Sequence, residues 1–247
     1  MPTLEDFVKI PLLLAVLWAH RVSYSPPNPF ASAPEAKSKE SGLATCVRIV
    51  RPEWARRASR WTVRAVALCE ILVILAAHVP IFASPYVLAV LDQHDPAGEG
   101  AKHLRITPTF ALGWFLIISA ALLRIACYRT MGKHFTFQIT IHKDHRLVTS
   151  GPYSVVRHPG YSALLMIVLG TMLCSFGSGS WLRECGIMET SVGKVFGVAW
   201  VADLLYVPVV MVFFRLKTED ELLKKEFGRE WEEWAKRTPY WLIPGIL

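Results

Sequence analysis

The chain has 247 residues, of which 53% are hydrophobic, and its mean hydropathy is +0.34. A chain this apolar is not an ordinary soluble domain. The formal net charge is +7. The basic residues lie between apolar runs rather than on one face, which is typical of loops beside a membrane and argues against a nucleic-acid-binding protein.

Five apolar runs with few charges predict membrane-spanning helices, of which the first is short. The second run contains Pro80 and Pro85 and is long for one span. It is either one kinked helix with an interfacial extension or a helix followed by a re-entrant piece. We therefore expect an all-α integral membrane bundle of about five transmembrane helices with a cytosolic amphipathic C-terminal helix. The runs cover approximately residues 7–19, 63–91, 108–126, 159–176 and 195–214.

Two regions are expected along the chain. Residues 1–127 hold the N-terminal transmembrane helices and a basic loop rich in Pro and Ser at about 21–60, and residues 128–247 hold two further transmembrane helices and a charged tail. The first apolar run lacks the flanks of a cleaved signal peptide, so we interpret it as a retained membrane segment. Lys and Arg concentrate in the loops 21–60 and 128–152, which places these loops and the tail in the cytosol.

The cysteine and histidine patterns do not predict a metal or redox site. The five cysteines show no CxxC spacing. His134, His142 and His145 have side chains that can bind a metal, but no Cys or carboxylate arrangement completes a site. The alternating "FTFQITIH" in the same loop is either a short strand or, since no second strand could pair with it, an ordered connector.

The stretch "TSGPYSVVRHPGYSALL" places polar side chains directly before an apolar run. Pro159 suits the first turn of a helix, so His158 lies near the N-cap, where free N–H groups favour an anion. Arg157 adds a positive charge, and Tyr153 and Tyr161 add hydroxyl donors. Two interpretations stay open at this point: a ligand site at the mouth of the bundle, or a set of interfacial anchors.

In the tail, Arg215 and Glu219 are one helical turn apart if the fifth helix continues. An apolar stripe then follows on the face of Glu219, which directs this acid toward whatever the stripe packs against. The alternative is an interfacial amphipathic helix with a weak surface ion pair. The stripe consists of Leu223, Phe227, Trp231 and Trp234.

These motifs together carry a resemblance. "HRLVTSGPYSVVRHPGYSA" followed by "RLKTEDELLKKEFGREWEEW" resembles the isoprenylcysteine carboxyl methyltransferase family over about residues 124–247. The resemblance implies a multi-pass enzyme of the endoplasmic reticulum membrane, with its active site facing the cytosol. Such enzymes transfer a methyl group from S-adenosylmethionine to the C-terminal carboxylate of prenylated proteins, which would be its substrates, with the lipid bilayer as its other partner and no nucleic acid or metal.

The resemblance also assigns residues. It makes Arg215 the catalytic, substrate-side arginine and Glu219 a donor-side acid, while Asp220 stands where the family usually has a second Glu. The residues that it implies for binding the methyl donor are Gln138, His145, Arg146, Leu147, Val148, Tyr153, His158, Pro159, Gly160, Tyr161 and Glu219.

The residues suit this chemistry. No GxGxxG follows a strand, so a Rossmann site is excluded. A carboxylate acceptor is already ionised at neutral pH and needs no general base. Catalysis then depends on aligning the acceptor oxygen with the methyl group, and Arg215 is suited to hold the carboxylate. Backbone N–H groups near His158, the tyrosines and Glu219 would hold the donor.

Three alternatives remain from the sequence. A phospholipid or other small-lipid methyltransferase would act on an amine and would not need Arg215 as a clamp. An NADPH-dependent membrane sterol reductase also ends in an acidic helix and a "PY…IP" terminus, and a scaffold without activity could keep the same fold. Separately, Glu70 is an acid within an apolar run, where it is either functional or paired with Arg64 or a neighbouring helix.

Overall fold

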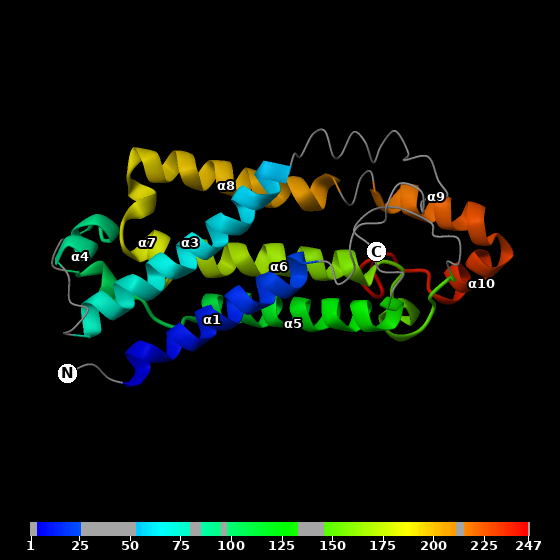
Figure 1. The fold of residues 1–247 in the computed structure, drawn as a ribbon, viewed down its shortest axis with the longest axis horizontal. Helices are drawn as coiled ribbons and strands as arrows, with labels where there is room; N and C mark the ends of the chain where they lie inside the picture. The colour runs from blue at the N-terminus through cyan, green and yellow to red at the C-terminus, as the bar shows by residue number, and fades with distance from the viewer. Residues whose placement is uncertain are drawn as a thin grey trace. The chain divides into compact units, whose positions relative to one another are not determined.

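The computed structural model describes residues 4–25, 53–79, 85–94, 98–132, 146–210 and 215–246. Helices dominate these ranges, which contain no strand (Figure 1). The predicted all-α class is therefore confirmed, while "FTFQITIH" lies outside the described residues. The α-helices are α1 Leu4–Tyr24, α3 Glu53–His78, α4 Pro85–Leu91, α5 Pro108–Met131, α6 Pro159–Phe176, α7 Trp181–Glu184, α8 Ser191–Val210, α9 Leu216–Phe227 and α10 Arg229–Arg237. Short 3-10 helices are η3 Gly100–His103, η5 Gly151–Ser154 and η6 Ile187–Glu189.

Within the described part of the chain, five helical segments are long and apolar enough to cross a membrane. The second predicted run is not one helix, because α3 ends at His78 and α4 is a separate helix of seven residues. The structure thus favours a helix followed by a second piece. The five segments are Phe7–Tyr24, Arg57–His78, Pro108–Met131, Pro159–Glu184 and Ser191–Val210.

The chain forms two compact units, each assembled from three separated stretches. Unit 1 comprises residues 1–20, 56–118 and 166–205, and unit 2 comprises residues 21–55, 119–165 and 206–247. The division into regions 1–127 and 128–247 stays a prediction from the sequence.

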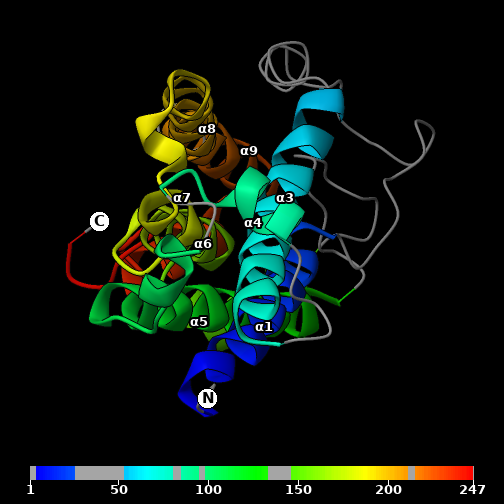
Figure 2. The same cartoon turned by 90° about the vertical axis from the view of Figure 1, so that its left-hand side faces the viewer.

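In unit 1, a buried ion pair joins the first half of α1 to the second half of α3. Figures 1 and 2 show these two helices beside each other. Lys9 pairs with Glu70, and both side chains are almost fully buried. Lys9 also donates to the carbonyl of Gly179 at 2.6 Å and lies 4.6 Å from the ring centroid of Phe110. The backbone N–H of Trp181 donates to Glu70 at 3.4 Å. The partner of Glu70 is therefore Lys9 on α1 rather than Arg64, and this pair also ties the two helices to the segment after α6.

Close packing of α5 and α6 in unit 1 depends on two glycines. A Cβ added to Gly113 would lie 2.8 Å from the carbonyl oxygen of Gly170, and one added to Gly170 would lie 2.6 Å from that of Gly113. Both distances are too short for a real side chain. Small residues at such positions let two apolar helices pack backbone against backbone, which is how helices associate where lipid replaces water.

A second polar cluster in unit 1 joins the segment after α4 to the segment after α6. The carboxylate of Asp92 is buried and accepts hydrogen bonds from the N–H groups of His94 and Ala101. The indole of Trp181 donates to the carbonyl of Leu91 at 2.7 Å. The bond between Trp181 and Leu91 connects segments 90 residues apart in the sequence.

The Lys9–Glu70 pair predicts a specific pattern of stabilities. Lys9→Met leaves a buried carboxylate without its cation and should lower the free energy of unfolding by about 3–5 kcal/mol. Replacing both residues, as Lys9→Met with Glu70→Leu, removes both buried charges and should recover most of this loss. Thermal unfolding of the purified variants in one detergent measures the difference. Lys102→Met, which breaks the exposed pair with Glu99, is the matched control and should cost about 1 kcal/mol or less. If Lys9→Met were as stable as Lys102→Met, the account would be contradicted.

Candidate functional site

The start of α6 is held by the C-terminal segment in unit 2. The backbone N–H of Arg157 donates to the carbonyl of Tyr240, and that of His158 donates to the carbonyl of Trp241, each at 2.9 Å. Figure 1 shows this C-terminal segment beside the beginning of α6. The residues before α6 are therefore fixed in position by a part of the chain about 80 residues further on.

This contact changes one expectation from the sequence. The N–H groups near His158 were assigned to a ligand, but those of residues 157 and 158 bind protein carbonyls instead. One turn into α6, the hydroxyl of Ser162 donates to the carbonyl of Leu242 at 2.6 Å. Any ligand at this site must then be recognised mainly by side chains.

The central side chain of the site is Asp220 on α9. Its Oδ1 lies 2.9 Å from His158 Nε2, and its Oδ2 lies 3.4 Å from Arg157 Nη1. All three side chains are largely buried. Since a carboxylate oxygen accepts, Nε2 is the protonated ring nitrogen of His158. Burial lowers the pKa of Arg157 and the charge of Asp220 opposes this effect, so the carboxylate offsets part of the cost of burying this guanidinium.

Glu219, the residue before Asp220, occupies a different environment. Tyr161 on α6 donates its hydroxyl hydrogen to Glu219 Oε2 at 2.6 Å, and the ring of Tyr161 lies 5.7 Å from that of His158. The Glu219 side chain is 31% exposed, against 9% for Asp220. Its other oxygen is 3.8 Å from His158 Nδ1, which is too far for a hydrogen bond. Glu219 is thus oriented by Tyr161 while still reachable by a ligand.

Tyr153 in η5 forms part of a small core beneath this cluster. The indole of Trp234 on α10 donates to the carbonyl of Tyr153 at 3.0 Å, and the Tyr153 hydroxyl lies 2.8 Å from the sulfur of Met131. Burial raises the pKa of Tyr153, so its hydroxyl stays protonated. The predicted donor residues Leu147 and Val148 pack against this same core.

The tail is two helices rather than one. Gly228 has φ 50° and ψ −116°, a conformation that favours glycine, and it ends α9 before α10 begins (Figure 1). The expected uninterrupted apolar stripe is therefore wrong. The turn brings Trp234 to Tyr153 and places Trp231 so that the guanidinium of Arg157 lies 5.7 Å from its ring centroid.

The remaining predicted residues occupy varied positions. Arg215 precedes α9 as its N-cap and is partly buried, one turn before Glu219. Arg146 is exposed, and Pro159 begins α6 and is buried. Gln138 and His145 lie outside the described residues. No group of three or more His, Cys, Asp or Glu within the described ranges is arranged to hold a metal ion.

The sequence analysis named Asp220 without giving it a role, and it did not consider Arg124. Asp220 lies four residues after the fully buried Leu216, so its position on the inner face of α9 could have been inferred from helical spacing. Arg124 on α5 is buried and donates to the carbonyls of Ser23, at 2.9 Å, and Gly160, at 3.4 Å. An arginine inside an apolar run was the available signal.

Comparison with known proteins gives one family and several relatives. The sequence model of the "Isoprenylcysteine carboxyl methyltransferase (ICMT) family" matches residues 112–180. A protein-S-isoprenylcysteine O-methyltransferase B of Arabidopsis thaliana is 32% identical over 133 residues, 51% of this chain and 55% of that protein. The protein-S-isoprenylcysteine O-methyltransferase of Homo sapiens is 30% identical over 141 residues, 55% of this chain and 41% of that protein. The resemblance noted from the motifs is confirmed.

A relative with a different name also matches part of the chain. A Delta(14)-sterol reductase of Mus musculus is 31% identical over 101 residues, which is 41% of this chain and 20% of that protein. The chain spans about half the length of the curated relatives it matches. The match to the family model includes His158 and Tyr161 but ends before Arg215 and Glu219, so the function must be argued from the site.

The Asp220 cluster predicts how the tail is held. Asp220→Ala leaves the buried Arg157 without its carboxylate and should lower the free energy of unfolding by about 3–5 kcal/mol. Asp220→Asn keeps an acceptor for one hydrogen bond and should cost less. Thermal unfolding and limited proteolysis of residues 215–246 measure both effects. The control is Glu226→Ala, which removes an exposed acid from the same helix; if Asp220→Ala were as stable as this control, the cluster would not hold the tail.

Proposed function

We propose that this protein is a membrane methyltransferase that moves a methyl group from S-adenosylmethionine to the C-terminal carboxylate of a prenylated cysteine, giving a methyl ester. The observation that carries the proposal is the position of Glu219. This acid is oriented by Tyr161, remains partly exposed, and follows Arg215 by one helical turn. An acid and an arginine side by side suit a cationic donor and an anionic acceptor.

The residues present fit the methyl donor. Within the described part of the chain, the buried Nε of Arg157 and the buried Nε1 of Trp231 have no hydrogen-bond acceptor. Buried donors left unpaired are costly, so they are expected to bind an anionic group, such as the carboxylate of the amino-acid end of S-adenosylmethionine. Glu219 would hold a positive charge of the donor, and the rings of His158 and Tyr161 offer faces for its other parts. When bound, S-adenosylmethionine supplies an electrophilic methyl group on a sulfonium.

Arg215 would hold the acceptor. A guanidinium binds a carboxylate through two parallel hydrogen bonds, which fixes the direction of the oxygen that attacks. No base is required since the acceptor is already ionised at neutral pH. Consistent with this, Tyr153 has a raised pKa and would not serve as one. The protein's contribution is then to align the acceptor with the donor and to exclude water.

The membrane setting suits a prenylated substrate. A prenyl chain is insoluble in water, and the five apolar segments offer a route through the bilayer while the carboxylate stays at the polar site. The basic loops place the tail, and with it Glu219 and Arg215, on the cytosolic side. By resemblance the membrane is that of the endoplasmic reticulum. Two alternatives would differ in their substrate. An amine-methylating enzyme would act on an amine, and a sterol reductase, which the 101-residue similarity favours, would act on a sterol.

Two substitutions on α9 test the division of roles. Arg215→Ala should reduce methylation of a short prenylcysteine substrate by about 30-fold to several thousand-fold in kcat/KM, because a desolvated charged hydrogen bond is lost. Arg215→Lys keeps the charge without the two-pronged geometry and should retain measurable activity. The binding of S-adenosylmethionine should change little in either variant.

Glu219→Ala is the complementary variant. It should weaken binding of S-adenosylmethionine strongly while the protein still inserts and folds. Lys225→Ala, an exposed residue of the same helix, is the control for both measurements. If purified protein transferred no methyl group to the prenylcysteine substrate, or if Arg215→Ala were as active as the parent, an amine or sterol acceptor would become the better proposal.

A further inference from the structure

In unit 1, the segment after α4 is joined to the loop between α6 and α8 by a histidine that the candidate site does not use. The ring of His94 lies between two oxygen atoms of that loop. Its Nδ1 is 2.8 Å from the carbonyl oxygen of Glu184, and its Nε2 is 3.1 Å from Oε1 of Glu189. The side chain of His94 is 42% exposed and that of Glu189 is 72% exposed. Both groups can therefore exchange protons with water.

The backbone around His94 fixes the position of this ring. The N–H of His94 donates to Oδ1 of the buried Asp92 at 3.2 Å, and the N–H of Gln93 donates to the carbonyl of Cys185 at 2.8 Å. Gly186 has φ 68°, and a Cβ added there would lie 2.9 Å from Cδ2 of His94. The ring thus lies directly against the loop, at a position that suits glycine.

The two contacts of the ring require a particular protonation state. A carbonyl oxygen and an ionised carboxylate are acceptors only, whereas a neutral imidazole has one N–H donor and one nitrogen that accepts. A neutral His94 would therefore place a lone pair against either Glu184 or Glu189. Only the imidazolium, with both nitrogens protonated, donates to both oxygens.

The charged groups around His94 favour the imidazolium. The hydrogen bonds to the Glu184 carbonyl and to Glu189 raise the pKa of His94 above its ordinary value of 6.5, burial opposes them, and the charges of Glu189 and Asp92 add to the increase. Asp92 belongs to the same segment as His94, and Glu189 belongs to η6. The carboxylate of Glu184 accepts from the N–H of Gly179 at 2.7 Å, so this residue offers its carbonyl to the ring.

We propose that His94 is a pH-sensitive clamp, which holds the loop between α6 and α8 while the ring is an imidazolium and releases one of its two contacts when a proton passes to water. Because the pKa is raised in the folded protein, the stabilisation is complete below about pH 6.5 and is lost as the pH rises through the raised pKa. The joined segments belong to loops with few basic residues, opposite to the 21–60 and 128–152 loops. The clamp thus responds to the pH on the side away from the cytosol.

The first test measures the protonation of His94 directly. Diethyl pyrocarbonate acylates neutral imidazole but not imidazolium, and tandem mass spectrometry of the digested protein reads the rate at His94 alone. In the full-length protein in detergent, we expect the rate to rise with an inflection above pH 6.5. Glu189→Gln replaces the carboxylate by an uncharged group that can also donate, so the inflection should move to lower pH.

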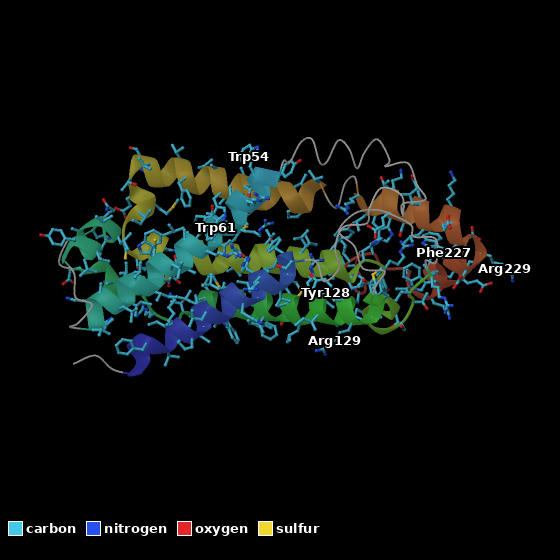
Figure 3. The ribbon with its side chains drawn as sticks, in the orientation of Figure 1. Trp54, Trp61, Tyr128, Arg129, Phe227 and Arg229 are labelled. Carbon is cyan, nitrogen blue, oxygen red and sulfur yellow. The ribbon has the colours of Figure 1, made fainter. Side chains whose placement is uncertain are left out.

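An exposed ion pair in unit 2 provides the matched control. Arg229 (Figure 3) donates to Glu233 at 2.9 Å. Glu233→Gln removes one carboxylate from a cation, as Glu189→Gln does, and should leave the inflection of His94 unchanged.

The second test measures the release of the loop. Hydrogen–deuterium exchange of peptides covering residues 183–190, corrected for the intrinsic effect of pH, should be slower at pH 6 than at pH 8. The expected difference is roughly twofold to fivefold, the range for an exposed charged contact. In His94→Gln, which cannot carry the charge, the corrected rates at the two pH values should be equal.

Three outcomes would overturn the proposal. An inflection at or below pH 6.5 in the parent protein means that the contacts do not favour the imidazolium. An inflection that is the same in Glu189→Gln means that this carboxylate does not hold the proton. Corrected exchange that is independent of pH in the parent, or that depends on pH equally in His94→Gln, means that His94 does not hold the loop.

Discussion

The buried carboxylate of Asp220 is the constraint on which the candidate site depends. It neutralises Arg157, fixes the protonated nitrogen of His158 and brings the first turn of α9 to the start of α6. Glu219 can then meet Tyr161, since the two acids are adjacent and their side chains point in different directions from α9. Asp220 holds the structure through its ion pairs, and Glu219 remains available to a ligand. A buried ion cluster of this kind is retained where it specifies an arrangement, because its net contribution to stability is small.

The carbonyl groups after α10 complete this arrangement. The N–H groups of Arg157 and His158 have no partner within α6, and the C-terminal segment supplies their acceptors. The turn at Gly228 and the hydrogen bond of the Trp234 indole direct the chain back toward α6. The carbonyls of the C-terminal segment then lie within hydrogen-bond distance of these N–H groups. The tail is therefore a structural part of the site, and it also supplies Glu219 and Arg215, the residues proposed to bind the donor and the acceptor.

The sequence predicted the features that depend on local physics. Apolar runs of sufficient length identify the membrane-spanning helices, and a proline after a polar residue marks the start of α6. The sequence did not predict features that depend on distant parts of the chain. Lys9 and Glu70 are 61 positions apart, and their pairing has no local signature. The break at Gly228 was missed since good helix formers flank it on both sides, and a single glycine within a helical pattern does not by itself require a turn.

The central claim is that one ligand site is built jointly by the start of α6 and by α9. Hydrogen–deuterium exchange, measured by mass spectrometry with and without S-adenosylhomocysteine, tests it directly because both segments are read in one experiment. The account predicts that the ligand slows exchange in peptides covering residues 157–165 and, together with them, in peptides covering residues 215–223. It also predicts no change in unit 1 peptides covering residues 98–107. Protection of only one of the two segments, or of neither, would contradict the account.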